Sequence, residues 1–386
     1  MDTATPIPNY QPLPFPLPVW LMQTLLVLGF FLHALPMNVI LGGGFICAVL
    51  FAMSKDKKSY QFRAAKALAV SLPVFISFAV TQGIVPLLFL QLLYGPAFYT
   101  SSILMAVPWI CLLLVVMTSY YLSYITIYRV LRKDDDGVAT RAAMILLVMA
   151  IGFAIVGYVF SNNMTLMLSP EKWLTMYQAS PNGLNLNNSE PSLHARYLHF
   201  FISAFAVAGM TLGCFGLFVK HDEQYSQWLI KTGSKIFVAA TVIQIPVGLW
   251  FLKSIPAQFA ANFMGADKIA SLVFAASMAL MIVALLASCI AAVSANRMAF
   301  LGGLIANALL ILAMIVNRHQ LRLFHLQNYV KPDSISVSTQ WDLLAIFLVS
   351  TVALIFYLVW LCKLVYRALM PQKESAAPLL VGMPND

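Results

Sequence analysis

The sequence predicts an all-α polytopic membrane bundle of nine transmembrane helices. Hydrophobic residues occupy 61% of the 386 positions and charged residues only 10%, and the mean hydropathy is +0.84. A bilayer core takes about 20 consecutive apolar residues per helix, and the chain supplies such runs repeatedly. Soluble domains do not have this composition, so we expect a membrane protein.

The apolar runs divide into nine spans joined mostly by short connections. The spans cover residues 17–50, 64–94, 100–130, 141–164, 193–219, 232–254, 267–293, 298–320 and 341–366. The two longest connections, 165–192 and 321–340, are polar. Both fall on the same side of the membrane because the spans alternate in direction.

Basic residues predict the orientation, with the N-terminus outside and the C-terminus inside. This orientation puts 16 of the 23 Lys and Arg residues on the inner side, as the positive-inside rule requires. The same rule explains the net charge of +9 without a nucleic-acid partner. No internal repeat is present, so we expect one domain over 1–386, with a bundle at 17–366 and tails at 1–16 and 367–386.

Acidic residues are absent from the middle of every span. Proton relays and ion-coupled carriers usually place carboxylates inside the membrane, so the sequence argues against a pump. The five cysteines form no CxxC or CxxCH motif, so neither a zinc site nor a covalently attached heme is expected.

Four of the six histidines lie instead near the outer ends of the spans: His194 and His199 open the fifth span, and His319 and His325 close the eighth. His33 lies deeper, within the first span, and His221 falls on the inner side. Neutral imidazole is a common ligand of metals and of heme iron. For any single histidine the alternatives are an interhelical hydrogen bond or an interfacial anchor.

Arginines accompany these histidines. Arg196 precedes His199 by three residues, so the two share one helix face. A guanidinium group at Arg196 suits a propionate of a heme whose iron lies on His199, and Arg318 and Arg322 in the eighth span suit the same role. Snorkelling to the interface is the alternative for Arg196. His194 is five residues before His199, about 140° away around the helix, and is expected to be an interfacial anchor.

Other uncharged residues in the spans point to helix contacts. Gly42–Gly44 is expected to let another helix approach closely. Asn38, Gln82, Gln91 and Gln244 are expected to make interhelical hydrogen bonds.

These motifs together resemble subunit I of the cytochrome bd quinol oxidase family. The resemblance rests on His33-Ala-Leu-Pro-Met-Asn, Arg196-Tyr-Leu-His199, and Ser338 to Leu344 at the start of the ninth span. It implies nine spans with the N-terminus outside, His33 as axial ligand of an active-site heme, and His199 as ligand of a low-spin heme b. Met278, in the seventh span, is placed to be the second ligand of that heme.

The chain also departs from the family pattern. The family uses glutamates in the second, third and eighth spans for proton delivery and heme ligation, and these spans carry no carboxylate here. The family's long quinol-binding loop after the sixth span is also missing. His319, or else His325, is then the expected ligand of another heme.

We therefore expect a heme b subunit of a respiratory electron-transfer complex in the bacterial inner membrane. It would hold two or three hemes and move electrons between the quinone pool and a periplasmic partner such as a c-type cytochrome. Membrane lipid and at least one other membrane subunit are expected partners. The outer loop near Lys253 and the opening of the fifth span are candidate quinone sites. The alternatives are a bd-type terminal oxidase or related gas-reducing enzyme, and a heme-free transporter or scaffold subunit.

Overall fold

The structure is a computed structural model that describes residues 13–133 and 135–369, with side chains except at six positions near the C-terminus. The chain forms two compact units, Met1–Asp342 and Leu343–Asp386, and each is described by itself. The described part of the second unit is helical throughout. The expectation of a single domain stays a prediction, as does the orientation of the two ends of the chain.

Nine helices of the described residues are long and apolar enough to cross a membrane, which confirms the predicted number of spans. They are α1 (Val19–Ala52), α2 (Tyr60–Leu104), α3 (Ala106–Ile125, continued by a π-helical turn to Val130), α4 (Val138–Met167), α6 (Pro191–Phe218), α7 (Glu223–Ser254), α9 (Lys268–Ser294), α10 (Arg297–Leu326) and α11 (Trp341–Leu369). The short elements are α5 (Trp173–Ala179), α8 (Ala257–Ala261), a π-helical turn at Asn262–Ala266, and 3-10 turns at Pro170–Lys172 and Pro332–Ser334.

The predicted break between the second and third spans is wrong. The residues 95–99 are helical, and α2 runs on to Leu104 before the chain turns at Met105. A kink at Tyr94, with φ −132° and ψ 28°, lies inside the helix. Pro96 causes the ambiguity in the sequence, because proline lacks an N–H donor and its ring displaces the carbonyl four residues earlier. Membrane helices tolerate such a proline when the local backbone adjusts.

The helix α1 is the centre of the first unit. It packs against α2, α4, α6 and α10, and 78% of its most apolar 18-residue segment is buried. Its three consecutive glycines face three different helices: Gly42 the backbone of Ala204 in α6, Gly43 two leucines of α2, and Gly44 the side chain of Ala150 in α4. The expected close helix approach at these glycines is confirmed.

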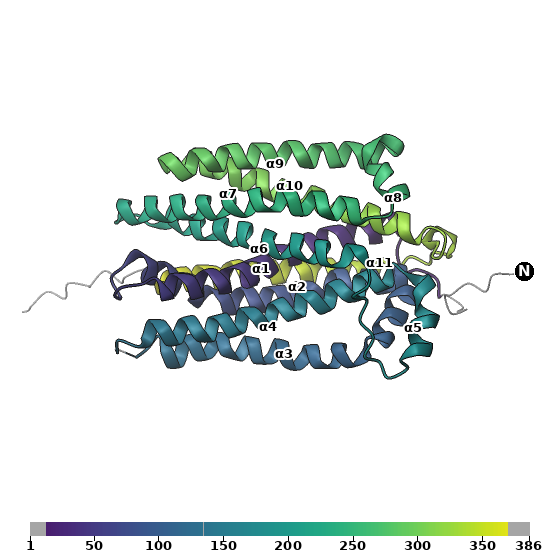
Figure 1. Ribbon diagram of the computed structural model, residues 1–386, viewed down its shortest axis with the longest axis horizontal. Helices are drawn as coiled ribbons and strands as arrows, with labels where there is room; N and C mark the ends of the chain where they lie inside the picture. Colours follow the sequence, from purple (N-terminus) through teal and green to yellow (C-terminus); the bar gives the residue numbers. More distant parts are fainter. Residues whose placement is uncertain (1–12, 134, 370–386) are drawn as a thin grey trace, which may run out of the picture. The chain divides into compact units, whose positions relative to one another are not determined.

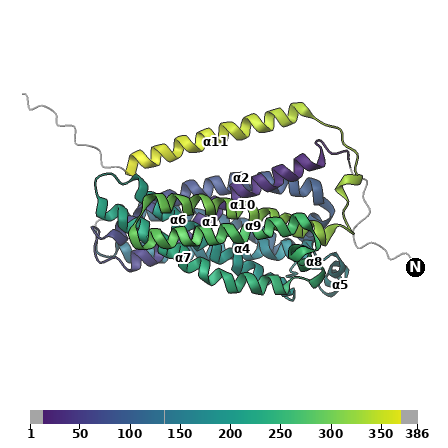
Figure 2. The ribbon, with the colours of Figure 1, turned by 90° about the horizontal axis from the view of Figure 1, so that it is seen from above.

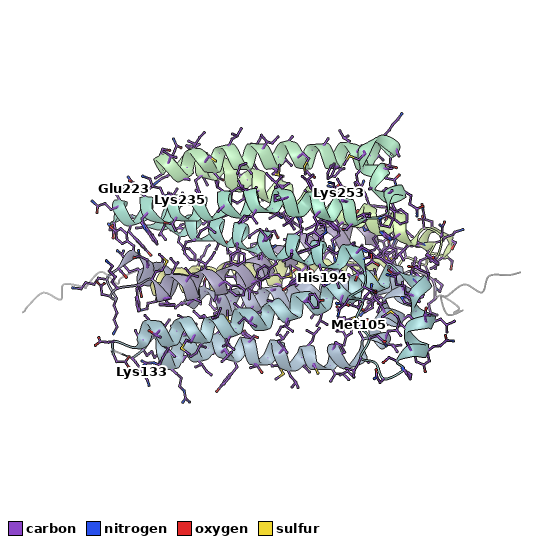
Figure 3. The ribbon with its side chains drawn as sticks, in the orientation of Figure 1. Met105, Lys133, His194, Glu223, Lys235 and Lys253 are labelled. Carbon is purple, nitrogen blue, oxygen red and sulfur yellow. The ribbon has the colours of Figure 1, made fainter. Side chains whose placement is uncertain are left out.

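The first unit has two distinct ends. The short helices α5 and α8 lie at one end, here called the α5 end, and the turns that join α1 to α2, α3 to α4 and α6 to α7 lie at the other, the far end (Figures 1 and 2). Figure 3 shows Met105, His194 and Lys253 toward the α5 end and Lys133, Glu223 and Lys235 toward the far end. The two longest connections of the prediction are therefore both at the α5 end.

Candidate functional site

Polar side chains gather inside the bundle near the α5 end, on three helices that otherwise bury apolar residues. The helix α1 contributes His33, α6 contributes Arg196 and His199, and α10 contributes Arg318, His319 and Arg322. All six were singled out from the sequence. Their contacts show what each group is free to bind.

His33 is held by α2. Its Nδ1 lies 2.8 Å from the carbonyl oxygen of Ala79, and a carbonyl only accepts, so Nδ1 carries the proton and donates it. The neutral ring then has its lone pair on Nε2. Gly83, one turn further along α2, leaves room for the ring, because a Cβ there would lie 3.0 Å from its Cε1 and Nδ1 atoms. A ring fixed through Nδ1 to a backbone carbonyl is the usual arrangement of a metal-ligating histidine.

Arg318 reaches from α10 to the aromatic rings next to His33. Its guanidinium carbon lies 4.3 Å from the ring centre of Phe30 and 5.9 Å from that of Phe200. The Phe30 ring is itself 5.9 Å from the ring of His33. Cation–π contacts of this kind hold a guanidinium group in place without neutralising its charge.

On α6, Arg196 and His199 face α7 together. Arg196 is 8% exposed, its guanidinium carbon lies 5.1 Å from the Phe251 ring, and its Nε is buried without a hydrogen-bond partner. The His199 ring lies 6.3 Å from the same Phe251 ring. The predicted shared helix face is confirmed, because both side chains contact one phenylalanine.

His199 has one nitrogen occupied and one free. The Gln244 side-chain nitrogen lies 3.3 Å from His199 Nε2, and because an amide nitrogen donates, Nε2 accepts and Nδ1 carries the proton. That Nδ1 is buried without a partner. Gly248, one turn from Gln244, faces the ring, since a Cβ there would lie 3.3 Å from His199 Cε1. For Nε2 to bind iron, the Gln244 amide has to move aside.

His319 differs from His33 in the nitrogen that is occupied. Arg322 Nη1 donates to His319 Nδ1 at 3.2 Å, and both side chains are buried. A neutral His319 then carries its proton on Nε2, which is the reverse of the tautomer at His33. His319 can ligate a metal only after the Arg322 contact is released or the ring loses that proton.

The three arginines lack a carboxylate partner within the described residues. The ion pairs there are Arg63 with Asp222, Arg141 with Asp135, Lys172 with Glu190, and Arg297 with Glu223. Arg196, Arg318 and Arg322 nevertheless lie close enough to one another to interact electrostatically. Buried charges are normally paired, so the arrangement fits a ligand that brings several anionic oxygens.

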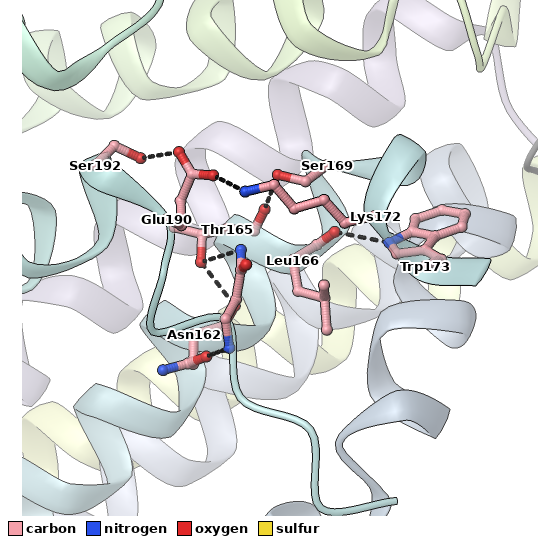
Figure 4. A network of polar contacts seen from close by, with 9 residues as sticks. Asn162, Thr165, Leu166, Ser169, Lys172, Trp173, Glu190 and Ser192 are labelled. Atoms are coloured by element: carbon pink, nitrogen blue, oxygen red, sulfur yellow. Dashed lines mark hydrogen bonds and ion pairs between the residues drawn. The ribbon is translucent and has the colours of Figure 1, made fainter. Parts of the chain in front are cut away.

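A polar network fixes the start of α6 (Figure 4). It also pairs Glu190, the carboxylate that interacts electrostatically with Arg196, with a lysine. Lys172 Nζ lies 2.5 Å from a carboxylate oxygen of Glu190, the residue before α6. The backbone N–H of Asn187 donates to the Asn162 side chain of α4 at 2.5 Å, and Trp173 Nε1 donates to the carbonyl of α4 residue Leu166 at 2.8 Å. The loop before α6 is thereby anchored on α4, and Glu190 is bound to Lys172.

The remaining candidates make their contacts with other residues, although His325 lies close enough to Arg196 to interact with it electrostatically. His325 packs on the Phe259 ring of α8 at 4.3 Å. His194 is exposed and stacks on Tyr158 of α4 at 6.2 Å. No hydrogen bond or ring contact among the described residues joins Met278 to the other candidates, and α7 packs against both α6 and the Met278 helix α9.

The helix boundaries in the structure bring the expected depth of Met278 in the membrane closer to that of His199. Met278 lies 10 residues after Lys268 at the start of α9, and His199 lies 8 residues after Pro191 at the start of α6. The difference of two residues corresponds to about 3 Å at 1.5 Å per residue. The boundaries predicted from the sequence give about 8 Å, from a difference of five residues.

The sequence missed the groups around the histidines. Nothing in the sequence singled out Phe30, Phe251, Gly83 or Gly248, although a glycine inside a long helix is a signal of close approach. The predicted interhelical hydrogen bond of Gln244 is confirmed. The one predicted for Gln82 is wrong, since this residue is 1% exposed and neither atom of its amide has a hydrogen-bond partner.

Comparisons with known proteins give a fold. No protein-family model matches the chain, and no curated protein matches it. Among solved structures, it is similar to a chain in the structure of bd oxidase from Geobacillus thermodenitrificans, with a TM-score of 0.70 and 12% sequence identity over 92% of this chain and 100% of that one. The chain is thus a multi-pass membrane protein with a cytochrome bd-like fold.

Proposed function

We propose that this chain is a heme b-binding membrane subunit of a respiratory electron-transfer complex. The observation that carries the proposal is a set of three arginines, Arg196 and Arg322 buried and Arg318 half-buried, that make no ion pair with a carboxylate among the described residues. Arg196 lies on the Phe251 ring beside His199, and Arg318 lies on the Phe30 ring beside His33. Two heme propionates on each porphyrin would supply the missing anions. The cytochrome bd-like fold supports the proposal, because a bd oxidase is itself a respiratory heme enzyme.

The residues fit heme in three respects. His33 presents Nε2 with its tautomer fixed by Ala79, as an axial ligand requires. His199 offers a second imidazole in an aromatic setting once Gln244 moves aside. Arg196 has a buried Nε without a partner, and a charge-assisted bond to a propionate would satisfy it. Bound heme would supply one-electron transfer, and the protein would set its orientation and potential.

The assignments beyond these are part of the same proposal. His319 or His325 would serve a further heme, for two or three in all, and Met278 would be the second ligand at the His199 heme. Electrons would pass between the quinone pool and a redox protein at the α5 end, such as a periplasmic c-type cytochrome. Another membrane subunit would complete the complex in the bacterial inner membrane.

A bd-type terminal oxidase is the second candidate, and the fold favours it. Oxygen reduction consumes protons inside a dry site, and the spans carry no carboxylate in their middle to deliver them. Gln82, directly before Gly83 on α2, leaves a buried amide without a partner near His33. An amide donates and accepts hydrogen bonds but does not ionise near neutral pH, so it cannot replace a carboxylate in proton delivery, and we place electron transfer first.

Spectra of the purified chain test the proposal. We expect a Soret band and a dithionite-induced α band of heme b, with heme content reduced in His33→Ala and in His199→Ala. His194→Ala is the matched control, because it removes an exposed histidine from the same helix as His199, and it should keep full heme content. Arg196→Gln should retain heme but lower its reduction potential, since a buried cation next to the heme disfavours the oxidised form.

Two results decide between the candidates. A preparation without a Soret band contradicts heme binding altogether. Carbon monoxide binding to a five-coordinate heme, together with quinol-driven oxygen uptake that His33→Ala abolishes, would favour the terminal oxidase over the electron carrier.

A further inference from the structure

The far end of the first unit carries a hollow of about 370 Å3 surrounded by basic side chains. Its cations come from two separate segments of the chain, the start of α2 with the turn before it and the turn after α3. They are Lys57, Arg63, Lys66, Arg132 and Lys133. Phe62, which is 6% exposed, and Leu131 give the hollow an apolar lining.

Two of the five cations are held in place by neighbouring side chains. Arg63 Nη1 lies 2.7 Å from a carboxylate oxygen of Asp222, and its guanidinium carbon lies 3.8 Å from the Tyr225 ring centre. The guanidinium carbon of Arg132 lies 5.0 Å from the Tyr128 ring centre. An anion entering the hollow would therefore meet guanidinium groups whose positions are already restricted, which reduces the entropy lost on binding.

The described residues that line the hollow include five cations and no carboxylate. Asp222 binds Arg63, and Asp135, two residues after Lys133, binds Arg141 at 2.5 Å and also interacts electrostatically with Lys133. Lys66, Arg132 and Lys133 make no ion pair with a carboxylate among the described residues. The N-terminus of α2 adds the positive end of a 45-residue helix.

Membrane topology alone accounts for the number of these cations but not for their arrangement. The positive-inside rule asks only that Lys and Arg lie in the inner turns. It does not require residues from two turns to surround one hollow with an apolar lining. Basic pockets between membrane helices on the inner side are the usual form of an anionic-lipid site.

We propose that this hollow binds a phosphate group, carried by the headgroup of an anionic phospholipid. The apolar lining of Phe62 and Leu131 would contact the glycerol and upper acyl region, and the cations would contact the phosphate oxygens. Free inorganic phosphate has the same chemistry without the apolar part. The proposal is independent of the proposed heme binding, whose candidate residues lie toward the other end of the bundle.

Native mass spectrometry of the delipidated full-length chain tests the site, with phosphatidylglycerol and phosphatidylcholine as probes and inorganic phosphate as competitor. The test variant combines Lys66→Gln, Arg132→Gln and Lys133→Gln. The matched control removes three basic residues from the same end but outside the hollow, with Lys220→Gln, Lys231→Gln and Lys235→Gln.

A Lys or Arg near an anionic lipid surface contributes about 1 kcal/mol, or about fivefold in affinity. The test variant should therefore lose about a hundredfold in affinity for phosphatidylglycerol, and the control should stay within about twofold. A third variant with Lys66→Arg, Arg132→Lys and Lys133→Arg keeps the charge and should keep the affinity. It separates loss of the site from loss of the fold.

Each outcome bears on the site. Equal losses in the test and control variants, or no loss in either, would overturn the proposal. Equal affinity of the wild type for phosphatidylcholine would also overturn it. Competition by inorganic phosphate in the wild type would identify free phosphate as a second source of the same ligand group, and its absence would assign the hollow to the lipid headgroup alone.

Discussion

Gly42 of α1 lies directly against the backbone of Ala204 in α6, so Gly42→Ala should destabilise the bundle. A Cβ at Gly42 would overlap the Ala204 carbonyl and lie 2.8 Å from the backbone nitrogen of Phe205. A backbone group cannot rotate away as a side chain can, so α1 and α6 have to separate. Overpacking of this kind costs about 1–3 kcal/mol.

Gly43 provides the matched control at the next position. A Cβ there would lie 3.5 Å from Leu72 and 3.6 Å from Leu68, which are ordinary contacts with side-chain methyl groups. Both substitutions gain the same preference of alanine over glycine in a helix, about 1 kcal/mol. That gain cancels in the comparison, so the difference between the two variants is the steric cost at Gly42 alone.

Thermal melting of the two purified variants in the same detergent measures this difference. Gly42→Ala should melt a few degrees below Gly43→Ala. It should also hold less heme, because α1 and α6 carry His33 and His199. If Gly42→Ala melts at or above Gly43→Ala, the close approach of α1 to α6 in this structure is wrong.

Three further predictions concern the ends of the helices and the site. Arg63 holds the pKa of Asp222 below its usual value. The pair therefore stabilises the fold above the unfolded pKa of about 3.9, and this contribution disappears as pH falls through the lower folded pKa. The melting temperature of Asp222→Asn should lack that acid-side loss, and the substitution should cost about 1 kcal/mol or less at neutral pH because the pair is partly exposed. Asn162→Ala leaves a buried backbone N–H of the loop before α6 unpaired, costs about 1–3 kcal/mol, and should speed hydrogen exchange in that loop, whereas unchanged exchange would contradict the network. Gly248→Leu fills the space next to the His199 ring and should lower heme content without lowering expression, so full heme content would exclude heme from that face.

Periodicity and hydropathy were sufficient for the membrane architecture. The hydrocarbon core accepts only segments that satisfy their own backbone hydrogen bonds, so each span is encoded locally in about 20 residues. The same locality explains why Arg196 and His199 were correctly placed on one face. The error at residues 95–99 arose because Pro96 is a loop signal in water but only a kink signal inside a membrane helix.

Contacts between helices were decided by the tertiary structure. The sequence indicated that His33, His199 and His319 were unusual. It did not indicate their hydrogen-bond partners, which are Ala79 for His33, Gln244 for His199 and Arg322 for His319. Each of these partners except Arg322 lies on a different helix from its histidine, more than 40 residues away. Rotation of one helix relative to another depends on how glycines and side chains pack, and a pattern read along one helix carries no information about it. The tertiary structure therefore decided which nitrogen of each of these three histidines has a hydrogen-bond partner.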